Sequence, residues 1–109
     1  MDIKQKTINA RGIKFFIEED GKEIARAFLF VIKNDLHDQP YGLLEDVYVD
    51  EAFRGRGLGT RLTKQVITAA KENKCYKLIA TSRTARVKVH ELYEKLGFKN
   101  YGIEFRMDF

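Results

Sequence analysis

Residues 54–60, with the sequence Arg-Gly-Arg-Gly-Leu-Gly-Thr, form the stretch of this chain best suited to hold a ligand. The glycines Gly55, Gly57 and Gly59 lack Cβ atoms, so the backbone can turn tightly there and a ligand can come close to it. Helical spacing begins directly after them, which adds unpaired helix amides and the positive end of a helix dipole. These features predict an anion site, most often one for phosphate or pyrophosphate.

Two well-known nucleotide-binding loops do not fit this stretch. A P-loop needs a glycine followed by lysine and then by serine or threonine, whereas Gly59 is followed by Thr60 and Arg61. A dinucleotide-binding loop needs the pattern G-x-G-x-x-G, whereas these glycines alternate with single residues. The remaining alternative is a plain strand-to-helix connection with glycines only for turning, and the flanking arginines argue against it.

The pattern of apolar residues predicts the elements that position this stretch. Strands are expected over residues 13–18 and 23–33, joined by the hairpin turn Asp20-Gly21, and a third strand over residues 43–49. The polar residues 34–40 are expected to form a loop. After the glycines, apolar residues recur at helical spacing and mark one helix face: Leu58, Leu62, Val66, Ala69 and Ala70.

The second half of the chain continues this alternation of strands and helices. A short strand is expected over residues 76–80, followed by a helix that carries Tyr93 and ends at Gly97 as its C-cap. Residues 98–109 alternate loosely and are predicted to supply one or two closing strands. The first twelve residues are either a partial strand or a loose end. This order predicts a single α+β domain over residues 1–109, without repeats or linkers.

Composition limits the classes of function. The chain has 109 residues, 44% of them hydrophobic, and a net charge of +4, as is ordinary for a globular protein. No apolar run approaches the roughly 20 residues of a membrane helix, and Lys4 and Lys6 precede no signal-peptide core. The lone Cys75 cannot form an internal disulfide, which favours the cytoplasm. The basic residues are mostly scattered, so nucleic-acid binding ranks last among the hypotheses.

Two motifs together resemble the GNAT family of N-acetyltransferases. Arg54-x-x-Gly57-x-Gly59, after a strand with the sequence Leu-Glu-Asp-Val-Tyr-Val, is similar to the family's acetyl-CoA signature. Residues 90–98, His-Glu-Leu-Tyr-Glu-Lys-Leu-Gly-Phe, are similar to its second hallmark, a helix that bears a tyrosine. The resemblance implies a mixed, mostly antiparallel twisted sheet with flanking helices, shortened at the N-terminus. It also implies transfer of an acetyl group to a primary amine by direct attack on the thioester.

The resemblance also assigns residues to the co-substrate, acetyl-CoA, and implies no metal. Backbone groups of one strand would pair with the pantetheine arm: Val47, Tyr48 and Val49. Backbone amides of the glycine-rich stretch would hold the pyrophosphate: Arg54, Gly55, Arg56, Gly57, Leu58, Gly59 and Thr60. The arginine side chains there would add positive charge. Backbone donors suit this task, because they need only a chain that can approach the phosphates closely.

Acetyl transfer needs a group that protonates the departing thiolate and a group that removes a proton from the amine. Tyr93 matches the family tyrosine placed near the cofactor sulfur as the general acid. Its alternative role is that of a core aromatic on the same helix face as Val89 and Leu96. The neighbouring His90 is expected to be structural or exposed on the surface.

Glu45 is the candidate general base, acting directly or through a water molecule. Strand alternation is expected to place Asp46 on the opposite face of the sheet, so that only one of the two carboxylates lines the cleft. The alternative is that nearby arginines or loop amides hold both carboxylates.

The acceptor side departs from the family pattern. Family members usually begin with a strand and two helices that enclose the acceptor, and too few residues precede Ile13 for these. We therefore expect an open acceptor side, or one completed by a second subunit in a homodimer. The segments Leu-Glu-Asp-Val and Cys-Tyr-Lys-Leu-Ile are similar to those of glucosamine-6-phosphate N-acetyltransferases, but the connection 81–89 is longer than theirs. A small-molecule or protein amine thus remains open as acceptor, and a non-catalytic acyl-CoA-binding module is the alternative function.

Overall fold

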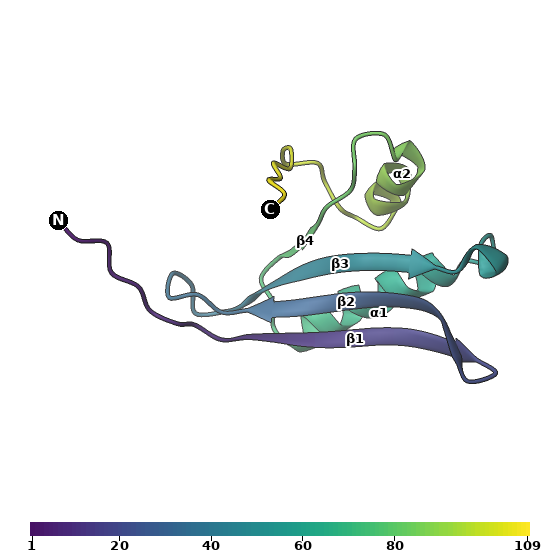
Figure 1. Ribbon diagram of the computed structural model, residues 1–109, viewed down its shortest axis with the longest axis horizontal. Coiled ribbons are helices and arrows are strands. Elements are labelled where there is room, and N and C mark those ends of the chain that lie inside the picture. The colour runs from purple at the N-terminus through teal and green to yellow at the C-terminus, as the bar shows by residue number, and fades with distance from the viewer.

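A computed structural model describes residues 1–109 and shows one mixed sheet (Figure 1). Its four strands lie side by side in chain order: β1 (Ala10–Glu19), β2 (Lys22–Ile32), β3 (Tyr41–Val49) and β4 (Leu78–Ala80). The first three are antiparallel, and β4 runs parallel to β3 after a crossover through helix α1 (Leu58–Glu72). This architecture confirms the predicted mixed, mostly antiparallel sheet with flanking helices.

The first hairpin turns where the sequence predicts it. Glu19 lies opposite Lys22, so Asp20 and Gly21 alone form the turn, with φ angles of 53° and 78°. A two-residue hairpin loop with positive φ at both positions matches the right-handed twist of the strands, and aspartate followed by glycine tolerates it best.

Helix α1 covers one face of the sheet and supplies half of the core. Leu58, the first residue of the predicted stripe, is only partly buried, and Thr63 is buried although it lies outside the stripe. The other four residues of the stripe are buried as predicted: Leu62, Val66, Ala69 and Ala70. They pack against inward-facing side chains of the central strands: Ala25, Ala27, Leu29 and Leu44. The Thr63 hydroxyl is buried without penalty, because it donates a hydrogen bond of 2.8 Å to the Gly59 carbonyl.

A second helix, α2 (Val87–Lys95), follows β4, and a single 3-10 turn, η1 (Glu51–Phe53), precedes the glycine-rich stretch. Gly97 ends α2 as predicted, with a φ of 102° and an amide that donates to the Glu94 carbonyl. None of the helices is both long and apolar enough to cross a membrane.

The predicted closing strands over residues 98–109 are absent, and that prediction is wrong. Those residues have no regular structure, and residues 1–9 likewise form a loose end rather than a strand. Alternation decides which side chains share a face, but a strand forms only where a neighbouring backbone completes its hydrogen bonds. In this structure no neighbouring strand pairs with residues 98–109.

Candidate functional site

The central strand β3 is paired along both sides for only part of its length. It pairs with β4 from Gly42 to Leu44, whereas its pairing with β2 continues to Val49. Residues 45–49 therefore have one edge without a strand neighbour, directly before the glycine-rich stretch. An extended polar molecule could hydrogen-bond to the backbone at such an edge as an added strand does. Val47, Tyr48 and Val49 all lie on this free edge.

A bulge interrupts β3 where its two acidic residues stand. Phe28 faces Glu45 and Arg26 faces Tyr48, so Asp46 and Val47 together lie opposite the single residue between them on β2. Asp46 adopts a φ of 49° there. A bulge of this kind adds one residue and shifts the alternation after it.

The bulge overturns the expectation that Asp46 simply takes the face opposite Glu45. The Asp46 carboxylate accepts a hydrogen bond of 3.1 Å from Nε of Arg26, which shares a strand face with Phe28, the partner of Glu45. Asp46 is thus held by an arginine, as the alternative interpretation has it. Glu45 takes part in no ion pair or side-chain hydrogen bond, so its carboxylate has no partner within the chain and could accept a proton or a hydrogen bond from a ligand.

The glycines of the loop adopt conformations that other residues rarely tolerate. Gly55 has a φ of 80°, and Gly57, the N-cap residue of α1, has a φ of 75°. A Cβ atom at either position would meet nothing within 4 Å, so the space before the loop is open. Gly59 differs, because it lies within the helix and a Cβ there would make an ordinary contact, 3.7 Å from Val49 Cγ2.

Every backbone amide from Gly55 to Thr60 lacks an acceptor within the chain. The first hydrogen bond of the helix is donated by the Arg61 amide to the Gly57 carbonyl, at 3.0 Å. No side chain caps this end of α1, and no acidic residue lies in its first turn. The positive end of the helix dipole is therefore open, and the free donors point to an anion.

Arginines frame the loop without neutralising it. Nε of Arg54 donates to the Val49 carbonyl at 2.9 Å, which fastens the loop to the end of β3. The Arg54 guanidinium lies 5.7 Å from the centre of the Tyr48 ring, and that of Arg56 lies 5.0 Å from the centre of the Phe53 ring. Neither arginine forms an ion pair with a carboxylate, so the positive charge of both is available to a bound anion.

Tyr93 and Glu45, distant in the sequence, lie close enough for the charge of one to act on the other. Burial raises the pKa of the Tyr93 phenol, and the Glu45 carboxylate raises that pKa further. The ring also packs against the ring of Phe98, with 5.2 Å between the ring centres, and against the edge of the core. Tyr93 thus contributes to the core and also keeps its proton at neutral pH.

Two further residues near this region, His90 and Ser82, have roles that sequence reasoning assigned only partly. His90 is structural, because its Nε2 lies 3.0 Å from the Arg83 carbonyl and ties the preceding connection to α2. Ser82, two residues after the end of β4, has a buried hydroxyl without a hydrogen-bond partner. Such groups are rare and mark positions where a ligand or water is expected. Its only signal in the sequence is a polar residue soon after an apolar strand.

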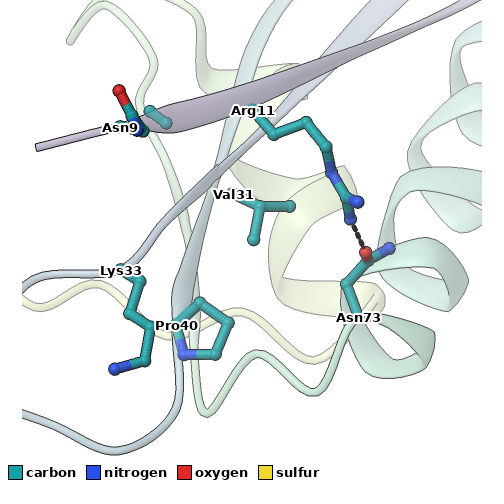
Figure 2. A pocket seen from close by; sticks show the side chains of 7 residues that line it. Asn9, Arg11, Val31, Lys33, Pro40 and Asn73 are labelled. Carbon is teal, nitrogen blue, oxygen red and sulfur yellow. Dashed lines mark hydrogen bonds between the residues drawn. The ribbon is translucent and has the colours of Figure 1, made fainter.

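A hollow lies near the C-terminal end of α1, away from the glycine-rich stretch, and none of the predicted site residues lines it. Figure 2 shows it, with a volume of about 360 Å³. The labelled lining residues come from β1, from β2 and from the segments around them: Asn9, Arg11, Val31, Lys33, Pro40 and Asn73. Arg11 donates a hydrogen bond to the side chain of Asn73, just beyond the end of the helix. Two of the polar groups that line the hollow are thus paired with each other.

Known proteins resemble this chain over most of its length. The sequence model of the acetyltransferase (GNAT) family matches residues 2–98. A probable glucosamine 6-phosphate N-acetyltransferase of Oryza sativa subsp. japonica is 36% identical over 91 residues, which are 83% of this chain and 53% of the relative. This chain therefore spans about half the length of that relative.

Solved structures show the same fold. Glucosamine-6-phosphate N-acetyltransferase from Arabidopsis thaliana superposes with a TM-score of 0.81 at 31% identity, over 90% of this chain and 67% of that one. A putative acetyltransferase from Agrobacterium tumefaciens gives a TM-score of 0.80 at 32% identity, over 89% and 68% of the two chains. The sequence motifs, the fold and the similar solved structures therefore all indicate the GNAT family.

Proposed function

The chain belongs to the GNAT family of acetyltransferases, and on that premise we propose that it transfers the acetyl group of acetyl-CoA to a primary amine. The observation that carries the proposal is the row of free amides from Gly55 to Thr60, placed directly after the strand edge that β4 leaves open. Pyrophosphate needs such donors, and an amide-bearing arm needs such an edge.

The proposed assignment gives each part of acetyl-CoA a place in the chain. Amides of residues 54–60 would hold the pyrophosphate, with charge added by Arg54 and Arg56. Backbone groups of Val47, Tyr48 and Val49 would pair with the pantetheine amides. Bound acetyl-CoA supplies an activated acyl group as a thioester. The positive φ of Gly57 and the open space around it support this assignment, because a ligand can come close to the backbone there.

The proposed chemistry divides between two side chains. The amine nitrogen attacks the thioester carbonyl carbon, a C–N bond forms and the C–S bond breaks. Glu45, directly or through water, accepts the proton that the amine loses. Tyr93 donates its proton to the sulfur that leaves, and the raised pKa of its phenol keeps that proton in place beforehand. The negative charge of the Glu45 carboxylate contributes to the raised pKa of the Tyr93 phenol.

Glucosamine 6-phosphate is the first acceptor to test, because relatives from rice and Arabidopsis carry that name. We extend the proposal only to primary amines as a class, small or on a protein, since this chain spans about half of the curated relative. A homodimer and a cytoplasmic location remain predictions of the sequence.

The test is release of free thiol from acetyl-CoA, measured with a panel of amines that includes glucosamine 6-phosphate, amino acids and peptide N-termini. A Cys75→Ser background removes the chain's own thiol from the readout. We expect amine-dependent thiol release with at least one member of the panel. Normal CoA binding without thiol release for any amine would instead support the non-catalytic acyl-CoA-binding module.

A further inference from the structure

The face of the sheet turned away from α1 carries an apolar patch with two aromatic rings. Side chains alternate along a strand, so the neighbours of the buried Ala27, Leu29 and Leu44 point to that opposite face. Three such neighbours, all partly exposed, form what we call the aromatic patch: Phe28, Phe30 and Leu43. In Figure 1, α1 lies behind the strands and no helix crosses β1 or β2 in front of them. The aromatic patch is therefore open to a ligand.

The rings of the aromatic patch have a fixed arrangement. The planes of Phe28 and Phe30 differ by only 5°, with 6.1 Å between the ring centres. Gly12 of β1 makes room for Phe30, because a Cβ atom at Gly12 would lie 2.9 Å from Cε1 of that ring. Phe16, also on β1, continues the aromatic surface and is 51% exposed. Contiguous apolar surface that stays open to solvent marks an interaction site.

The aromatic patch begins directly beside the candidate base. Phe28 lies opposite Glu45 across the β2–β3 pair. Residues opposite each other in antiparallel strands share a face, with their Cβ atoms about 4.5–5.5 Å apart. An amine that gives its proton to Glu45 could therefore lay its carbon skeleton over Phe28. A linker of two carbons between an amine and an aromatic ring spans roughly 5 Å from nitrogen to ring centre, as ordinary bond lengths give, which matches this spacing.

The charges around the aromatic patch favour a cation over an anion. Lys14 forms an ion pair with Glu23, and Arg26 forms one with Asp46. Both cations beside the patch thus already have carboxylate partners, whereas Glu45 has none. An ammonium group would meet an unpaired carboxylate here, but a phosphate group would meet no unpaired cation over β1 and β2. The surface therefore suits an amine whose remaining part is apolar.

We propose that the aromatic patch binds the apolar group of the acceptor, and that the acceptor is a small primary amine with an aromatic or aliphatic group a short linker away from its nitrogen. The inference rests on the proposed acetyl transfer, in which Glu45 accepts the amine proton, and it narrows the class of amine. Burial of the apolar group against Phe28 and Phe30 stabilises the complex and orients the nitrogen toward Glu45. Glucosamine 6-phosphate has no such group, so it is the poorer acceptor.

The first test compares two acceptors that differ only in a phenyl or a hydroxyl group, phenethylamine and ethanolamine. The kcat/KM of the wild type should be about 10-fold or more higher for phenethylamine, because only its ring is buried. Phe28→Ala should bring the two values close together. Phe16→Ala, on the same face but one strand farther from Glu45, is the matched control and should keep most of the preference. A preference for ethanolamine, glucosamine 6-phosphate or a peptide N-terminus, or an equal effect of both variants, contradicts the inference.

A binding measurement separates this inference from the proposed acetyl transfer and needs no variant that might fail to fold. The full chain, with ¹³C-labelled phenylalanine and with CoA bound, is titrated with phenethylamine and followed by NMR. We expect the largest shifts at the rings of Phe28 and Phe30, and little change at Phe15, which packs against the core on the α1 side. No shift at Phe28 and Phe30 overturns the inference even if some amine is acetylated. Shifts there without acetylation of any amine support the binding site and contradict the proposed transfer.

Discussion

The two ends of helix α1 treat their backbone groups in opposite ways. At the C-terminal end the chain satisfies itself: the Asn73 amide and the Asn73 side chain both donate to the Ala69 carbonyl, at 2.9 and 2.8 Å, and the Cys75 amide donates to the Ala70 carbonyl. At the N-terminal end no amide from Gly55 to Thr60 has an acceptor and no side chain caps the helix.

The difference between the two helix ends indicates where a ligand could bind. A helix end normally acquires a cap, because unpaired amides lower stability. Here one end is completed by a side chain from the first strand, Arg11 bonding to Asn73, while the other end carries glycines and arginines instead. The hollow in Figure 2 lies beside the satisfied end.

The largest expected effect separates chemistry from binding. Tyr93→Phe removes the proposed proton donor but leaves the glycine-rich loop intact, so the turnover number should fall about 100-fold or more while CoA affinity stays within about twofold. Steady-state kinetics and calorimetric titration of CoA measure the two quantities. Unchanged turnover would remove Tyr93 from the mechanism and leave it a core residue.

The next effect tests the open end of the helix directly. A Gly55→Ala/Gly57→Ala variant places two side chains at positive φ, and each is expected to lower the free energy of unfolding by about 1–2 kcal/mol. The two methyl groups would also occupy the open space in front of the loop. CoA should bind about 100-fold more weakly by calorimetry. Binding as tight as that of the wild type would show that the loop does not hold the phosphates.

A change at the C-terminal end of α1 should lower the stability of the protein and leave its affinity for CoA unchanged. Asn73→Ala removes the hydrogen bonds to Ala69 and Arg11, and each contributes about 0.5–1.5 kcal/mol. The midpoint temperature of thermal unfolding should therefore fall by several degrees. CoA affinity, extrapolated to the folded protein, should not change. A clear loss of affinity here would abolish the contrast between the two ends.

The smallest effect is expected from the third glycine of the loop. Gly59 lies within the helix, and a Cβ there would make only an ordinary contact with Val49. Gly59→Ala should thus leave the fold intact and change the dissociation constant for CoA by no more than about twofold. This makes it the matched control for the double variant. A large loss would mean that the phosphates come closer to Gly59 than the empty loop indicates.

Local patterns predicted much of this molecule. Asp20-Gly21 specified a hairpin by its own conformational preferences, and the stripe from Leu58 to Ala70 specified the face that α1 buries. The anion site at the glycine-rich stretch also rests on features that act over a few residues, the glycines and the helix start, and it stays a prediction.

Features that depend on distant partners were not predicted. The bulge at Asp46 arises from the register between two strands, and Arg26, which holds Asp46, lies on the other one. Alternation along β3 alone could not reveal it. Residues 98–109 likewise carry the pattern of a strand but lack a neighbour in this chain, so the pattern was visible and its outcome was not.

We propose that the free amides at the start of α1 hold the phosphates of CoA. Backbone amide resonances of the ¹⁵N-labelled protein, followed by NMR during titration with CoA, test this residue by residue. We expect the largest shifts from Gly55 to Thr60, with little change at Arg11, Lys33 and Asn73. Shifts concentrated at those three residues, around the hollow at the other end of α1, would contradict it.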